Sequence, residues 1–169
     1  RSPIFPGLHS SSSTDDPHVK AAGRVRNRTE AKRPVKEKVY DRAYFERWYR
    51  ARKSRIESPA ALRRRVALAV AMAERFLGRP IRLALDIGCG EGRWRGELLR
   101  LRTKLSYQGV EPSAYAVQRF GKRRNIVQGG FTDLAQLDLG GPFDLVICAD
   151  VLHYLEMDEL AKGLPALVS

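Results

Sequence analysis

A hydrophobic run that ends in an acidic residue and a glycine-rich turn is the feature that most constrains the fold of this 169-residue chain. Residues 85–92 read Leu-Asp-Ile-Gly-Cys-Gly-Glu-Gly. Glycine has no Cβ, so it adopts positive φ angles and lets a ligand approach the backbone closely. Downstream, Trp94, Leu98 and Leu101 recur at helical spacing. The pattern predicts a buried parallel strand, a tight turn and a helix whose N-terminus faces a small-molecule site.

The spacing of these glycines bears on the identity of the ligand. A dinucleotide-binding turn carries a small residue three positions after its second glycine, where the helix packs on the strand. Here that position is Arg93, whose guanidinium would crowd the contact. This argues against NAD or FAD without excluding them. The chain also lacks the Gly-Lys-Ser/Thr ending of loops that hold nucleoside triphosphates.

A second strand is predicted from Leu105 to Val110, ending at Glu111. Pro112 and Ser113 then suit the start of a helix. A carboxylate at the carboxyl end of a neighbouring strand can accept hydrogen bonds from both hydroxyls of a ribose. Each such bond to a charged acceptor is worth roughly 1.5–3 kcal/mol. Glu111 therefore indicates a ligand that contains adenosine.

Three ordered motifs in this chain resemble those of class I S-adenosylmethionine-dependent methyltransferases of the bacterial small-molecule type. They occupy residues 86–92, 110–113 and 143–154, and the resemblance covers about residues 80–160. It implies an α/β fold, a Rossmann-like parallel sheet in the order 3-2-1-4 with helices on both faces. It also implies an enzyme that transfers a methyl group from S-adenosylmethionine to an unidentified small-molecule acceptor.

The resemblance also implies roles for individual residues. Gly88 and Gly90 would face the methionine part of the cofactor, with Asp86 nearby, and Glu111 would hold the ribose. The turn at residues 129–133 would border the adenine.

Adenine recognition would then rest on backbone groups at Gly130 and on the ring of Phe131, although Phe131 could equally be a core residue. Asp150 follows the fourth strand, at the mouth of the same crevice, and its alternative role is to cap a turn. The candidate cofactor-binding residues are Asp86, Gly88, Gly90, Glu111, Gly130, Phe131 and Asp150.

No catalytic residue is assigned from the sequence. His153 could act as a base, but a packed or solvent-facing histidine fits equally well. Cys89 and Cys148 fall at the ends of neighbouring strands and could lie close together, although small buried residues are the ordinary explanation. Neither their number nor their spacing suggests zinc, so we expect no metal. Two cysteines without a secretory signal, and no apolar run of about 20 residues, predict a cytoplasmic protein that does not enter a membrane.

The charge of the chain leaves a second function class open. The formal net charge is +12, and 30 of the 31 Lys and Arg residues precede residue 126. The runs Arg63–Arg65 and Lys122–Arg124 could attract phosphates, although such runs are usually solvated helix faces. One alternative is therefore a non-enzymatic protein that binds nucleic acid or another polyanion; the 8% aromatic content disfavours nucleic acid. An NAD-binding reductase is the third alternative.

The chain divides into three predicted parts. Residues 1–38 combine serine, proline and charge and are expected to be a disordered tail. Residues 39–78 should form two helices, of which the first has an aromatic face that either covers the crevice as a lid or packs. The second should begin at Ser58-Pro59, end at Gly78 and bury one apolar stripe. The aromatic face consists of Tyr44, Phe45, Trp48 and Tyr49, and the stripe of Leu62, Val66, Ala69, Val70, Ala73, Phe76 and Leu77.

Residues 79–169 should form a partial S-adenosylmethionine-binding domain, because similar proteins continue through three more strands after the fourth. We therefore expect a fragment that lacks the C-terminal strands. Its fourth strand would be an exposed apolar edge, the isolated chain would be poorly stable, and it need not be active. The acceptor and the oligomeric state cannot be read from these residues.

Overall fold

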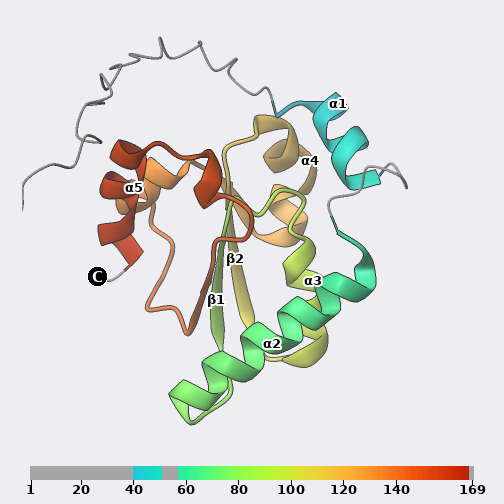
Figure 1. Ribbon diagram of the computed structural model, residues 1–169, viewed down its shortest axis with the longest axis vertical. Coiled ribbons are helices and arrows are strands. Elements are labelled where there is room, and N and C mark those ends of the chain that lie inside the picture. Colours follow the sequence, from blue (N-terminus) through green and yellow to red (C-terminus); the bar gives the residue numbers. More distant parts are fainter. Residues whose placement is uncertain (1–39, 51–56, 168–169) are drawn as a thin grey trace, which may run out of the picture. The chain divides into compact units, whose positions relative to one another are not determined.

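The computed structural model describes residues 40–50 and 57–167, so the expected disordered tail lies outside the described residues. The sheet has four parallel strands in the order β3-β2-β1-β4 (Figure 1). Their bounds are Leu83–Ile87 for β1, Ser106–Glu111 for β2, Ile126–Gln128 for β3 and Leu145–Ile147 for β4. The predicted strand order and parallel pairing are confirmed.

The register of β1 and β2 brings the two predicted ligand-binding segments together. Ile87, the last residue of β1, lies opposite Val110, the residue before Glu111. The backbone N–H groups of Gly88 and Cys89 then both donate to the carbonyl of Val110, over 2.8 and 3.2 Å. The glycine turn and Glu111 therefore share the carboxyl edge of the sheet.

Helices cover both faces of the sheet, as the fold class requires. Ala84 of β1 packs in a core with residues of helices α2 (Pro59–Leu77) and α3 (Arg93–Leu101). Leu85 and Ile87, which point the opposite way, pack in a second core. That core includes residues from the 3-10 helices η2 (Phe131–Gln136) and η4 (Leu164–Leu167) and from α5 (Met157–Gly163).

Helix α2 begins and ends where the sequence predicts. The side chain of Ser58 accepts a hydrogen bond from the backbone N–H of Ala61, and Gly78 ends the helix with a φ of 65°. The stripe is buried at Leu62, Val66 and Val70, but the prediction is wrong for its C-terminal end. Phe76 is 84% exposed and Leu77 39%, because no described element covers the last turn.

The predicted aromatic helix consists of α1 (Arg42–Phe45) followed by a π-helical turn, η1 (Glu46–Arg50). Asp41 caps it by accepting a hydrogen bond from the N–H of Tyr44. Phe45 is only 1% exposed and packs against Ala116 and Phe120 of helix α4 (Ala114–Arg124). The segment 40–50 is therefore anchored on α4. None of the described helices is apolar over a length that would span a bilayer.

Candidate functional site

A cavity of about 640 Å³ opens at the carboxyl ends of β1, β2 and β4. Its volume falls within the range of small-molecule sites, roughly 300–1,000 Å³. Six of the seven candidate residues line it, namely Asp86, Gly88, Gly90, Glu111, Phe131 and Asp150. Gly130 is not among the lining residues, and its neighbour Gly129 takes that place.

Glu111 joins the glycine turn to the start of α4. Its side chain is buried, with Oε2 accepting from the N–H of Gly90 at 2.7 Å and Oε1 accepting from the N–H of Ser113 at 3.0 Å. Burial raises the pKa of Glu111, and the two backbone hydrogen bonds oppose that rise. A carboxylate offers about four acceptor sites, so two further hydrogen bonds can be accepted from a ligand in the cavity.

Asp86 is buried on β1 and is held by a tyrosine from β2. The Tyr107 hydroxyl donates to Oδ2 of Asp86 at 2.7 Å. Gly109 lies directly opposite Asp86 in the sheet. A Cβ on Gly109 would lie 3.2 Å from the Tyr107 hydroxyl, so the glycine leaves room for the tyrosine side chain to reach Asp86. Burial raises the pKa of Asp86 from 3.8 to about 7, although the Tyr107 hydrogen bond acts in the opposite direction.

The glycine turn has the conformation and the crowding that glycine alone tolerates. Gly88 and Gly90 have φ angles of 65° and 56°. A Cβ on Gly88 would lie 2.4 Å from Cγ2 of Val151, and a Cβ on Gly90 would lie 2.4 Å from the hydroxyl of Tyr49. The turn is therefore packed between the end of β4 and the N-terminal segment.

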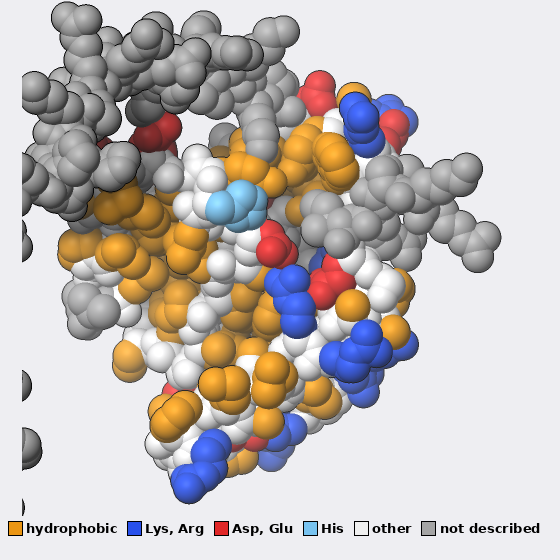
Figure 2. Space-filling model, viewed as in Figure 1, with side chains coloured by type: hydrophobic (Ala, Val, Ile, Leu, Met, Phe, Trp, Pro, Cys, Tyr) orange, Lys and Arg blue, Asp and Glu red, His pale blue; other side chains and the backbone are white. Residues whose placement is uncertain are grey.

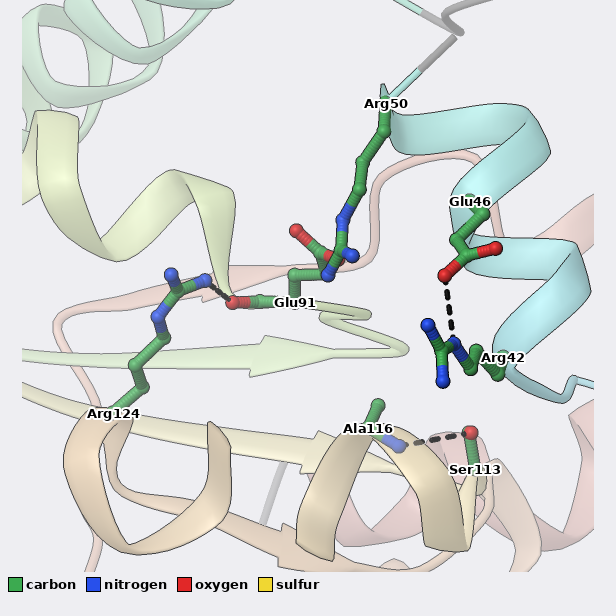
Figure 3. A network of polar contacts seen from close by, with 7 residues as sticks. All are labelled: Arg42, Glu46, Arg50, Glu91, Ser113, Ala116 and Arg124. Carbon is green, nitrogen blue, oxygen red and sulfur yellow. Dashed lines mark hydrogen bonds and ion pairs between the residues drawn. The ribbon is translucent and has the colours of Figure 1, made fainter. Parts of the chain in front are cut away.

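Residues 40–50 form one wall of the cavity, and polar contacts fix both ends of this segment. Figure 3 shows the end at Arg50, which lies beside Glu91. Arg50 pairs with Glu91 in the glycine turn at 3.3 Å, and Arg124 of α4 donates to the Glu91 carbonyl. At the other end, the Ser113 hydroxyl donates to the Tyr40 carbonyl at 2.6 Å. The sequence left open whether the aromatic segment covers the crevice or packs; in the structure it packs on α4 and also lines the cavity.

An ion-pair cluster borders the cavity beside β4. Both terminal nitrogens of Arg65 lie 3.2 Å from Oδ2 of Asp150, and Arg65 also pairs with Glu57 at 3.4 Å. Its guanidinium stacks 5.5 Å from the ring centre of Trp94. Asp150 has a φ of 60°, which is uncommon for a residue with a side chain. The sequence predicts Asp150 at this position but gives no signal for Arg65, Glu57 and Trp94 at the cavity, because their contacts join distant segments.

Phe131 is mainly a core residue. It is 4% exposed and packs with Leu85, Ile87 and Val110, and a Cβ on Gly163 of α5 would lie 2.3 Å from its ring. The N–H of Gly130 donates to its own helix, to the carboxylate of Asp133 at 2.7 Å. At the predicted adenine end, Phe131 therefore contributes packing, while the Gly130 N–H is already used in a hydrogen bond to Asp133.

Other residues weighed in the sequence have the following positions, and for Arg93 the structure contradicts the expectation. The guanidinium of Arg93 does not crowd the helix–strand contact: it lines the cavity and donates to the carbonyl of Glu57. His153 is exposed, stacks on Tyr154 and is not among the lining residues. Cys89 and Cys148 pack in different hydrophobic clusters. The described residues include no cluster of side chains that could hold a metal ion.

The chain belongs to a methyltransferase family: the model of the methyltransferase domain matches residues 85–169. This confirms the resemblance to S-adenosylmethionine-dependent methyltransferases. Comparison with curated proteins gives no match.

Solved structures of methyltransferases share the fold at low sequence identity. The plantazolicin methyltransferase BpumL, crystallised with a pentazolic desmethylPZN analogue and SAH, superimposes with a TM-score of 0.55 at 17% identity, covering 66% of this chain and 44% of that one. The amino pentose methyltransferase CalS10 of Micromonospora echinaspora, solved with SAM, superimposes with a TM-score of 0.54 at 20% identity. The match covers 79% of this chain and 53% of CalS10. This chain thus spans about half the length of these structures.

Proposed function

We propose that this chain binds S-adenosylmethionine in the cavity and forms the cofactor-binding part of a methyltransferase that acts on a small molecule. The observation that carries the proposal is the position of Glu111, whose carboxylate touches the glycine turn and still has acceptor capacity toward the cavity. The structures of BpumL with SAH and of CalS10 with SAM, which share the fold of this chain, support S-adenosylmethionine as the ligand.

The residues present fit such a ligand. Gly88 and Gly90 line the cavity without side chains of their own and would border the amino-acid end, while Glu111 would accept hydrogen bonds from the ribose hydroxyls. Gly129 and Phe131 would border the adenine. Bound there, S-adenosylmethionine supplies a methyl group on a positively charged sulfur. The aromatic side chains of residues 40–49 would exclude water from this group and so favour transfer to a positioned acceptor.

Isothermal titration with S-adenosylhomocysteine tests the proposal. We expect Glu111→Ala to weaken binding by about 2 kcal/mol, roughly 30-fold, because charge-assisted hydrogen bonding to the ribose is lost. Glu97→Ala is the matched control, since Glu97 pairs with Arg100 on the surface of α3. Because Glu111 also holds two backbone N–H groups, unfolding of each variant is measured in parallel. A folded Glu111→Ala variant with unchanged affinity would contradict the ribose role, and a wild-type chain that does not bind would contradict the proposal.

A further inference from the structure

We infer that the methyl acceptor is an amine, bound by the acidic and aromatic wall beside β4. This inference rests on the proposed function and concerns the part of the cavity lined by Asp150 and Glu57. Its first support is the charge of the lining. Apart from Asp86 and Glu111, which are assigned to the cofactor end, three carboxyl groups line the cavity, Glu57, Asp150 and Glu159, against the two guanidinium groups of Arg65 and Arg93.

Both guanidinium groups are already engaged. Arg65 lies between Asp150 and Glu57, and Arg93 donates to the Glu57 carbonyl. An acceptor that carries a carboxylate or phosphate would have to displace these contacts and would meet the surplus of acidic groups. A protonated or partly charged nitrogen gains from the same surplus. Figure 2 shows acidic and basic side chains gathered in the middle of this face, surrounded by hydrophobic ones.

Aromatic rings complete the wall. Trp48 and Tyr44 line the cavity from the N-terminal segment, Trp94 from α3 and Tyr154 from the segment after β4. Ring faces attract cations electrostatically, and the attraction is strongest for tryptophan. Carboxylates beside ring faces attract an ammonium group both by charge and through the rings, and they bind a neutral hydroxyl less strongly.

The chemistry of the transfer agrees with this lining. An amine that binds as an ammonium first gives one proton to a lining carboxylate, such as that of Asp150 or Glu57. The neutral amine then attacks the methyl carbon with its lone pair, a C–N bond forms as the C–S bond breaks, and the electron pair stays on sulfur. The positive charge therefore moves from sulfur to nitrogen, where carboxylates at the acceptor end stabilise it. A hydroxyl acceptor must also lose a proton to a base during transfer. It then ends as a neutral ether, which gains less from the lining carboxylates than the positively charged product of amine methylation does.

Asp150 is the residue on which this inference depends most. It is held in a left-handed backbone conformation with φ at 60°, and strain of this kind concentrates at functional sites. Arg65 contacts Asp150 only through Oδ2 in the hydrogen bonds of the cluster. Arg65 is then a positioning residue, which fixes the two carboxylates while Trp94 supports its guanidinium.

Three probes of one shape test the inference: benzylamine, benzyl alcohol and benzoate, titrated with and without S-adenosylhomocysteine and followed by ligand-detected NMR. We expect benzylamine to bind about fivefold more tightly than benzyl alcohol, and benzoate to bind most weakly. Asp150→Asn and Glu57→Gln should each reduce the preference for the amine to about twofold or less. Asp158→Asn is the control, since Asp158 is exposed on α5 and is not a lining residue.

The result that overturns the inference is an equal or stronger affinity for the alcohol or the acid, no binding of any probe, or an amine preference that survives both substitutions. Titration of S-adenosylhomocysteine alone separates this failure from failure of the proposed function. If that compound binds and the amine preference is absent, only the acceptor class is wrong.

Discussion

Removing the hydroxyl of Tyr107 should destabilise the protein by an amount that depends on pH. The hydroxyl donates to the buried carboxyl of Asp86 at 2.7 Å, and Tyr107 is 4% exposed, so Tyr107→Phe removes one hydrogen bond and keeps the packed ring. A hydrogen bond to a charged group contributes roughly 1.5–3 kcal/mol and one between neutral groups about 1 kcal/mol. The cost of the substitution therefore follows the ionisation of Asp86.

The direction follows from the pKa of Asp86. Its pKa is raised from 3.8 in the unfolded chain to about 7 in the folded state. Between these values the folded state holds a proton that the unfolded chain releases, so this group makes folding less favourable as pH rises from about 4 to about 7. Above that window Asp86 is ionised and depends most on Tyr107. We expect Tyr107→Phe to cost about 1 kcal/mol near pH 5 and about 2 kcal/mol near pH 8.5.

Urea unfolding, followed by circular dichroism at both pH values, measures this difference. Tyr115→Phe is the matched control, because the Tyr115 hydroxyl is buried and has no hydrogen-bond partner among the described residues. That control should be neutral or slightly stabilising at both pH values. Asp86→Asn should remove the part of the stability loss between about pH 4 and 7 that comes from Asp86 and leave the part that comes from Glu111, whose pKa burial also raises. A Tyr107→Phe penalty that is equal at both pH values, or larger near pH 5, would refute the reasoning.

Two further predictions concern the glycine turn. Gly90→Ala should lower the affinity for S-adenosylhomocysteine at least about tenfold, because a Cβ at this positive φ would collide with the Tyr49 hydroxyl. Its control is Gly96→Ala in α3, where nothing lies within 4 Å of the added Cβ; in thermal unfolding this variant should be more stable than wild type by up to about 1 kcal/mol. Arg50→Ala should speed S-adenosylhomocysteine release about two- to fivefold in stopped-flow displacement, because the partly exposed pair with Glu91 ties residues 40–50 to the turn. Release at the wild-type rate would show that this pair does not hold the segment.

The parts of the site that could be predicted from the sequence are those set by local spacing. The glycine turn follows a strand whose apolar run and parallel pairing fix where it ends, and Glu111 ends the neighbouring strand in the same register. Because parallel strands present their carboxyl ends at one edge, two separate motifs could be placed together without any knowledge of distances. The same reasoning correctly placed Asp150 after β4.

The contacts that could not be predicted from the sequence join segments that lie far apart in the chain. Tyr49 reaches Gly90 and Arg65 reaches Asp150, over 41 and 85 residues of sequence, and neither carries a periodic signal for that contact. The run Arg63–Arg65 was interpreted as a solvated face or a polyanion site, yet one of its three guanidinium groups is committed to carboxylates at the cavity. That difference bears on function, because an arginine already paired with two acids adds no net attraction for phosphate. The surplus of acid around Arg65 therefore opposes a polyanion at the cavity and favours a cationic acceptor, although the chain as a whole carries a net charge of +12.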